Sequence, residues 1–434
     1  MSCSRLLWVI PLCSWLFAGD LIAQEAEVPV EPLTLSTLLD KIRENNPELR
    51  ASQLEADALS LRSSQVASLP DPRVAITYQP YPLFTARGTQ RTQWRVEQAI
   101  PFPGKLGLKE DIAGFGAEIA KHETHTFEQD LLFDAKRAFI ELYRIQQQQQ
   151  LIQAFHTRLQ DFEENAATKY VVGSGLQQAI LKAQLERNAL LQQQLSLELL
   201  HRSAAETLGQ LLNTPVSDMS SELDSVELAM PAGELASEDV LFDAARRLRP
   251  EARALEAAQQ KTDTQIALAK KEFLPDFGFN VTYFDVGPAN IPATASGRDA
   301  FAIGVSLNVP LWRGKLNAQL AEARTRKNQV AARIEGLDTA FRAQIADLIS
   351  QISQEKRQLA LFQEALIPQA ETTREATLSA YTTGRTNFLD LLDAERMLFS
   401  LQAGYEDAIA RYMKAIAALE RALGVSSLSD IDRL

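Results

Sequence analysis

The sequence predicts a mostly α-helical chain with a small β part, in which one unit has been duplicated and fused. The first observation is a repeat with a period of about 205–211 residues, which is too long for a stack of short repeats. The second is that each copy contains two stretches of alternating apolar and polar residues and two very long helical stretches. The matching segments are SLPDPRVAITY at 68–78 with FLPDFGFNVTY at 273–283, IPFPGK at 100–105 with VPLWRGK at 309–315, and YVVG at 170–173 with YTTG at 381–384.

The first residues have the composition of a secretory signal peptide, which we place at 1–23. Arg5 supplies a positive charge, and the mostly apolar run at 6–17 is too short to span a bilayer. The only cysteines, Cys3 and Cys13, lie inside this segment, so the mature chain offers no thiol nucleophile or cysteine metal site. An uncleaved anchor helix is the alternative reading. The residues before Cys13 are a poor lipoprotein signal, so we expect no lipidation.

After the signal peptide we expect two repeats, at residues 24–236 and 237–434. In the first repeat, a β-hairpin occupies about 72–100 and a helical hairpin about 105–212. In the second, the corresponding hairpins occupy about 276–309 and about 315–423. The segment around 214–237, which contains two prolines, is expected to link the two copies.

Shorter helices are expected before each β-hairpin. Ser36 is the expected N-cap of the first helix, and Pro47 separates it from a second helix at 48–69. The second repeat has the same arrangement, with one helix at 240–248 and another at 250–274. A proline follows each of the two longer helices and ends it.

Four stretches have the alternation of β-strands that bury or expose one apolar face. The residues between the apolar positions are mostly Ser, Thr, Asn, Gly, Glu and Arg. Polar loops with Gly and Pro, at 80–92 and 285–299, should join the strands into two β-hairpins. The apolar positions are Val74, Ile76 and Tyr78; Trp94 and Val96; Phe277, Phe279, Val281 and Tyr283; and Phe301, Ile303, Val305, Leu307 and Val309.

The long helices carry apolar residues at every seventh position, which is the spacing of coiled coils. A helix of about 65 residues would be on the order of 100 Å long, so we expect rods rather than a compact domain. Glycines at 173, 175 and 384 should allow the chain to reverse between helices. The spaced residues are Leu131, Ala138, Ile145, Ile152 and Leu159; Ile345, Ile352, Leu359 and Leu366; and Leu391, Leu398, Tyr405, Tyr412 and Leu419.

The four strands fit either a small soluble sheet or part of a membrane barrel that is apolar outside and polar inside. Two features favour the barrel: the chain is exported, and each β-hairpin lies far in sequence from its helical turn. Four strands cannot close, and open edges in lipid would leave backbone groups without hydrogen bonds. The chain must therefore oligomerise, and three copies would supply twelve strands.

These features resemble the TolC-like outer membrane efflux proteins, and the resemblance covers essentially the whole mature chain. It rests on the duplicated order of all the markers together. The phrase EQAIPFPGK at 97–105 is most similar to the branch that serves heavy-metal efflux pumps. The markers are NNPE at 45–48, LP at 69–70, VPL at 309–311, YTTG at 381–384 and DLLDA at 390–394.

The resemblance implies a homotrimer in the outer membrane of a Gram-negative bacterium. Its strands would form a twelve-stranded transmembrane β-barrel in lipid, and its helices a periplasmic α-barrel. It also implies two partners, a periplasmic adaptor (membrane fusion) protein and an inner-membrane pump of the resistance-nodulation-division type. The function it implies is a passive exit duct for substrates that the pump delivers, and the heavy-metal branch makes metal cations the candidate substrates.

In this family the helical turns at the periplasmic end contact the adaptor. The resemblance assigns that role here to Tyr170, Gly173, Gly175, Tyr381, Gly384 and Arg385. Ordinary helical-hairpin geometry would explain the glycines without any partner. A family latch between a tyrosine and an arginine is partly present, since Tyr381 matches but Arg385 lies one position early.

The family also has two aspartates that ring the closed tunnel mouth, and they correspond to Asp390 and Asp393. Residues three apart share one face of a helix. In a trimer they would form two stacked rings of three carboxylates, which would favour cations. The alternative reading is two solvated carboxylates. The first repeat has Gln178 and Ala179 near this position, so only one repeat supplies acid.

The sequence gives no sign of an enzyme or a cofactor. It contains no P-loop, dinucleotide fingerprint or serine elbow. His122 and His125 could share a helix face, but no carboxylate cluster surrounds them at metal-site spacing. A net charge of −12 without any Lys/Arg-rich block excludes a nucleic-acid partner. The alternatives left open are a periplasmic coiled-coil adaptor or scaffold, and a duct of the same fold that exports drugs, peptides or proteins.

Overall fold

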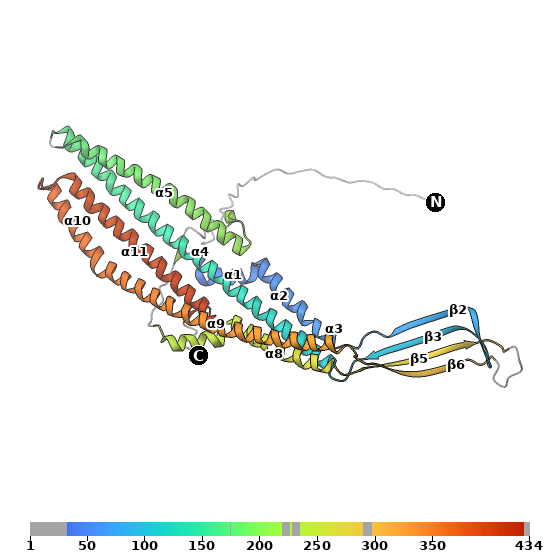
Figure 1. Ribbon diagram of the computed structural model, residues 1–434. Helices are drawn as coiled ribbons and strands as arrows, with labels where there is room; N and C mark the ends of the chain where they lie inside the picture. Colours follow the sequence, from blue (N-terminus) through green and yellow to red (C-terminus); the bar gives the residue numbers. More distant parts are fainter. Residues whose placement is uncertain (1–32, 174, 219–225, 228–234, 290–296, 429–434) are drawn as a thin grey trace, which may run out of the picture.

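The computed structural model is an elongated molecule with a four-stranded sheet at one end and two helical turns at the other (Figure 1). It describes residues 33–173, 175–218, 226–227, 235–289 and 297–428. The expected signal peptide therefore lies outside the described residues, as does most of the segment expected to link the repeats. Among the described residues, no helix is both long enough and apolar enough to cross a membrane.

Both repeats have short helices, then two strands, then a long helical hairpin, which agrees with the duplication seen in the sequence. In the first repeat the elements are β1 (Leu33–Thr34), α1 (Leu35–Asn45), α2 (Pro47–Ser60), α3 (Arg62–Ala67), β2 (Arg73–Thr85), β3 (Gly88–Ile100), α4 (Lys105–Val171) and α5 (Gln177–Leu212). A 3-10 turn, η1 (Val216–Asp218), and β4 (Val226–Glu227) follow. In the second they are α7 (Glu238–Leu248), α8 (Pro250–Lys271), β5 (Asp276–Val286), β6 (Ala300–Asn308), α9 (Arg313–Leu361), the π-turn η2 (Phe362–Leu366), α10 (Ile367–Thr382) and α11 (Phe388–Leu423).

The sheet has the strand order β2-β3-β5-β6, and every neighbouring pair is antiparallel. The register places the predicted apolar residues opposite one another: Val96 faces Val281, and Trp94 faces Tyr283. These residues are exposed, with Val305 at 72% and Val74 at 66%. The polar face is the more enclosed, and Thr282 on it is only 2% exposed. The sheet therefore presents its apolar face outward and has no apolar core of its own.

The predicted loop at 80–92 is wrong, because β2 and β3 run on through most of it. Only residues 86–87 separate the two strands. Pro80 and Pro82 lie inside β2, where the register shifts between Tyr78 and Leu83. A proline cannot donate to a ladder, but β2 is an edge strand and a bulge accommodates the lost bonds.

The heptad prediction is confirmed, because the spaced residues form the core. All five positions of the first copy are buried in α4, and Ile345, Ile352 and Leu359 are buried in α9. The core continues along α11, where Leu391, Leu398 and Leu419 are buried. The four long helical segments thus pack as two hairpins that lie against one another through α4 and α11 (Figure 1).

Three helix boundaries differ from the prediction. Thr34, not Ser36, caps α1, because its side-chain oxygen accepts a hydrogen bond from the Thr37 N–H at 3.3 Å. The helix expected at 48–69 is interrupted at Leu61. The first helix of the hairpin expected at about 315–423 widens into the π-turn η2 just before Pro368. A proline has no N–H to donate and its ring crowds the preceding turn, so a wider turn relieves both problems.

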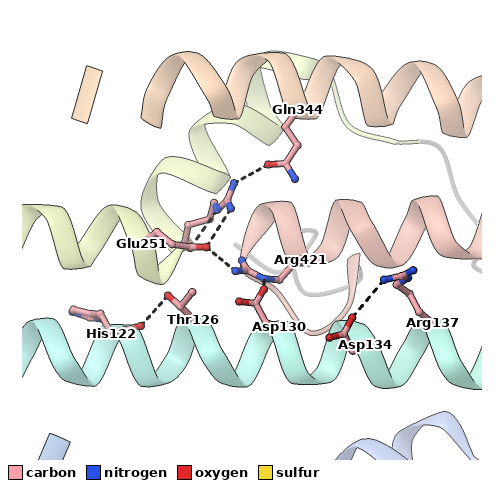
Figure 2. A network of polar contacts seen from close by, with 9 residues as sticks. His122, Thr126, Asp130, Asp134, Arg137, Glu251, Gln344 and Arg421 are labelled. Atoms are coloured by element: carbon pink, nitrogen blue, oxygen red, sulfur yellow. Dashed lines mark hydrogen bonds and ion pairs between the residues drawn. The ribbon is translucent and has the colours of Figure 1, made fainter. Parts of the chain in front are cut away.

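A polar network joins the two repeats where α4, α8, α9 and α11 meet (Figure 2). Arg421 donates to Asp130 on α4 at 2.6 Å and to Glu251 on α8 at 2.7 Å. Arg249 donates to Gln344 on α9 at 3.2 Å and also to Glu251. Burial acts to raise the pKa of Glu251, but hydrogen bonds from Arg249 and Arg421 outweigh it and hold the pKa below its ordinary value. The ionised carboxylate is therefore the form that stabilises this junction.

We expect Glu251→Gln to lower the free energy of unfolding by about 1–3 kcal/mol at pH 7, because two arginines lose a charged acceptor. A carboxyl whose pKa is lowered by folding stabilises above its unfolded pKa and loses that effect as the pH falls. The difference from the native chain should therefore shrink below about pH 4.5. Denaturant unfolding followed by circular dichroism at pH 7 and pH 3.5 measures it. Glu256→Gln, at an exposed position on α8, is the matched control, and an equal loss there would contradict the assignment.

Candidate functional site

The end of the molecule opposite the sheet contains the two turns that the sequence singled out. In the first, α4 ends and Gly173 adopts a left-handed conformation with φ of 76°. Its N–H donates to the carbonyl of Tyr170 at 3.0 Å. Gly175 is also required, because a Cβ there would lie 2.9 Å from backbone atoms of Lys169 and Tyr170. Both glycines are thus explained by the reversal itself.

The second turn uses the same device. Gly384 has φ of 74°, and its N–H donates to the carbonyl of Tyr381 at 3.1 Å. The Arg385 N–H donates to the carbonyl of Ala380 at 2.8 Å, which completes a Schellman-type ending of α10. Asn387 then starts α11, since its side-chain oxygen accepts from the Asp390 N–H at 3.0 Å.

The two tyrosines of the repeated motif have opposite environments. Tyr381 is 9% exposed, whereas Tyr170 is 48% exposed. The Lys169 ammonium lies 3.7 Å from the centre of the Tyr381 ring and donates to the Tyr381 carbonyl at 3.3 Å. Phe388 packs edge-on against the same ring, and burial raises the pKa of Tyr381. Tyr381 therefore holds the second turn against the first, while Tyr170 faces outward.

A cavity of about 360 Å³ lies between the two turns. Ala166 and Lys169 of α4 and Leu176 line its side on the first repeat. Tyr381 and Phe388 line its side on the second. The tips of the two hairpins thus enclose a cavity beside the buried cluster that Tyr381 and Phe388 form with Phe162 of α4.

Asp390 and Asp393 lie together on the exposed side of α11. Asp390 sits in the first turn of the helix, where the helix dipole favours a carboxylate, and the Thr386 hydroxyl donates to it. Asp393 is 75% exposed, and the Arg396 guanidinium lies 3.6 Å from its carboxylate. Arg396 in turn donates to Glu186 on α5. The prediction from sequence did not include Arg396, which reduces the net negative charge beside Asp393.

Arg385 does not make the family's latch within this chain. Its guanidinium donates to the Thr383 hydroxyl at 3.1 Å, which keeps it inside its own turn. The contacts of Tyr381 in the described structure are instead with Lys169 and Phe388. Lys169 from the first repeat thus takes the place beside the tyrosine ring.

A buried glutamate links α11 to two neighbouring helices and was missed in the sequence. Glu395 is 1% exposed, and Arg158 on α4 donates to it at 3.1 Å. Arg374 on α10 lies 4.0 Å from its other oxygen. The sequence could have indicated this buried carboxylate. Glu395 lies on the same helix face as the apolar residues Leu391, Leu392 and Leu398, at a position where a buried helix face normally carries an apolar residue.

His122 and His125 on α4 each lie near one glutamate. His122 lies 4.0 Å from Glu118, and His125 lies 3.6 Å from Glu128. Burial lowers the pKa of His122, which favours its neutral form. No group of three or more metal-ligating side chains occurs among the residues that the structure describes.

Comparison with known proteins finds similarity to outer membrane efflux proteins. The family model "Outer membrane efflux protein" matches residues 241–425. The chain is 23% identical over 412 residues to outer membrane protein TolC of Vibrio cholerae, covering 92% of each chain. A shorter stretch of 135 residues is 25% identical to the cobalt-zinc-cadmium resistance protein CzcC of Cupriavidus metallidurans and spans 31% of that protein. Among solved structures, the outer-membrane channel OprN has a TM-score of 0.74 at 17% identity, covering 90% of this chain and 89% of the other.

We expect Tyr381→Ala to loosen the joint between the two turns, because removing a buried aromatic side chain costs about 3–5 kcal/mol. Amide hydrogen exchange in peptides covering 166–176 and 381–389 should accelerate by on the order of a hundredfold. Tyr170→Ala is the matched control, since this tyrosine is half exposed and belongs to the same motif. Equal acceleration in both variants would show that Tyr381 has no special role in the joint.

Proposed function

We propose that the chain is a TolC-like outer membrane efflux protein and that it forms the outer-membrane duct of a tripartite efflux system. Its sheet lies in the outer membrane and its helices extend into the periplasm. Proteins of this family are channels rather than enzymes, and they act together with an adaptor and a pump. The duct is therefore passive: it supplies a path, and the energy comes from the pump.

The single observation that carries the proposal is the outward apolar face of the sheet. The exposed residues on it come from all four strands, and the paired register places them side by side. A soluble sheet would bury such a face on a core, whereas here the helices continue from the end of the sheet and leave it uncovered (Figure 1). Hydrocarbon is the environment in which this face is stable.

Closure of the barrel requires further copies of the chain. The strands β2 and β6 are the two edges of the sheet, and each leaves one row of backbone groups unpaired within the chain. In lipid those groups must be satisfied by another strand. Three copies give twelve strands, an even number within the range of known barrels. We accordingly propose a homotrimer, with the helical hairpins of all copies forming the tunnel wall.

The proposed partners are a periplasmic adaptor and an inner-membrane pump of the resistance-nodulation-division type. The adaptor contact is assigned to the two turns, where Tyr170 and Val171 are exposed apolar side chains. The proposed cargo is heavy-metal cations. This is supported by the similarity of one 135-residue stretch to the cobalt-zinc-cadmium resistance protein CzcC.

We propose that Asp390 and Asp393 of three copies form two carboxylate rings at the tunnel mouth. They share the exposed side of α11, and their carboxylates point away from the core that Leu391 and Leu392 form. Three copies would place six carboxylates around one constriction, which would attract cations and repel anions. Arg396 moderates this field beside Asp393.

The membrane assignment predicts different outcomes for two adjacent residues. Val305→Arg places a cation on the outward face, at a cost of about 2–4 kcal/mol near the bilayer midplane, whereas Ser306→Arg places it on the polar face. We expect the first to reduce strongly the yield of detergent-extracted trimer, measured by native mass spectrometry, and the second to leave it nearly unchanged. A water-soluble monomer without detergent would instead favour the adaptor or scaffold alternative.

The gate assignment predicts that neutralising both aspartates weakens cation block. We expect Asp390→Asn with Asp393→Asn to raise the single-channel conductance in planar bilayers and to raise the half-blocking concentration of a multivalent cation roughly tenfold, because the ring charge is lost. Glu371→Gln with Glu375→Gln, two exposed acids on α10, is the matched control. Conductance and block unchanged from the native channel would remove the two aspartates from the gate.

A further inference from the structure

The base of the sheet contains an ion pair that joins the two repeats within one chain. Lys105, the first residue of α4, is 2% exposed. Its ammonium donates to Asp276 at 2.9 Å, to Glu272 at 3.3 Å and to the carbonyl of Leu274 at 3.2 Å. The Phe102 N–H also donates to Asp276, at 2.8 Å. This cluster lies where β3 ends and the neighbouring strand β5 begins.

Each side of this cluster has a counterpart in the other repeat. Asp276, the first residue of β5, ends a Leu-Pro-Asp sequence, and Asp71 ends the same sequence just before β2. Lys105 follows Gly104 at the start of α4, and Lys315 follows Gly314 at the start of α9. The buried residues of the two helices keep the same spacing from these lysines: Leu131, Ala135 and Ala138 correspond to Phe341, Ile345 and Leu348.

The counterparts are separated within one chain. Asp71 precedes β2 and Lys315 follows β6, and these strands are the two opposite edges of the sheet. Both side chains are exposed, and no hydrogen bond or ion pair is formed by either one within the described residues. Large apolar side chains beside them are also uncovered: Leu69 is 51%, Leu311 74% and Trp312 81% exposed. The chain therefore carries both partners of a second ion pair, Asp71 and Lys315, but they lie at opposite edges of its sheet and do not meet.

The two hairpins have the same strand register over Arg73–Tyr78 and its counterpart Gly278–Tyr283, so the β3–β5 pairing can be transferred in this stretch. Val74 pairs with Val96 in the first hairpin, and the equivalent Phe279 pairs with Val305 in the second. In the β3–β5 junction, Val96 pairs with Val281. In the transfer, β6 takes the place of β3, and β2 of the partner subunit takes the place of β5. Val305 is the counterpart of Val96, and Ile76 is the counterpart of Val281, so Val305 lies opposite Ile76 of the partner subunit. The same transfer places Ser306 opposite Ala75 of the partner subunit, as Glu97 lies opposite Asn280.

We propose that Lys315 of one subunit pairs with Asp71 of the partner subunit, and that β6 joins the partner's β2 with Val305 opposite Ile76. The occupant of the free edge is thus a second copy of this chain, held in the register of the internal β3–β5 junction. The transferred register continues the outward apolar face without a break, because both paired residues belong to it. This inference rests on the proposed trimeric duct, and it adds the contact that sets how the copies fit.

Disulfide cross-linking tests the register, in a background with Cys3→Ser and Cys13→Ser. Directly opposed residues in an antiparallel pair have Cα atoms about 4.5–5.5 Å apart, within disulfide range. We expect Val305→Cys with Ile76→Cys, or Ser306→Cys with Ala75→Cys, to give dimers and trimers on non-reducing gels. Successive residue pairs along the two strands alternate between a Cα separation of about 5.5 Å and one of about 4.5 Å. At least one of the two cysteine pairs should therefore link efficiently. Val305→Cys with Tyr78→Cys, a two-residue slip, should link at least tenfold less.

Val96→Cys with Val281→Cys serves as the internal control, since it should link within one chain and give no ladder. If native mass spectrometry finds trimers but only the slipped pair links, the inferred register is overturned while the duct proposal stands. If no trimer forms even for the native chain, the duct proposal itself fails. Linkage at the inferred pair in the assembled trimer supports both.

Charge reversal tests the ion pair separately. We expect Lys315→Asp or Asp71→Lys alone to raise the monomer fraction after mild heating in detergent by roughly fivefold, because like charges then face each other. The combined Lys315→Asp and Asp71→Lys variant should return to within about twofold of the native chain. Arg324→Asp, an exposed change on the same helix, is the control. A double variant no better than either single variant would overturn the pairing.

Discussion

The backbone groups along the free edges of β2 and β6 are the constraint on which the rest of the architecture depends. The outward face of the sheet is apolar, so its stable environment is hydrocarbon, where no water can satisfy an open edge. One chain supplies four strands and therefore cannot satisfy its own edges. In the proposed duct, further copies of the chain close the sheet, and the helices that continue from the strands then surround the same axis. The proposed tunnel is thus a consequence of barrel closure.

Within the helical part, the two repeats meet along α4 and α11 through a seam that mixes apolar and charged contacts. Arg144 lies 3.2 Å from Asp407, and Lys414 lies 2.5 Å from Glu141. Nearer the turns, Glu395 is almost fully buried against Arg158. Buried ion pairs add little net stability compared with apolar packing, but they require a defined partner. A contact of this kind between α4 and α11 fixes how the two hairpins align. Separating the hairpins then costs less free energy than separating a fully apolar contact would.

The sequence predicted the parts of the fold that a simple period controls. Alternation identified the outward face of the sheet, and the seven-residue spacing identified the buried stripe of α4. Features that depend on tertiary neighbours were not predictable. Pro80 and Pro82 suggested a loop, but an edge strand with a bulge tolerates them. For the site, the glycine turns followed from local geometry, whereas the burial of Tyr381 beside Lys169 depends on contact between the repeats and has no local signal.

The two ends of the molecule have diverged to different degrees. The β-hairpins of the two repeats keep the same strand register, because closure of a barrel allows no slip between its strands. At the other end the repeats differ: the second hairpin contains the π-turn before Pro368, the paired aspartates and the buried tyrosine, and the first has none of these. A duct needs a fixed pore in the membrane and an adjustable mouth in the periplasm. In the proposed duct, the matching strand registers meet the first requirement, and the second requirement falls to the turns, where the two repeats differ.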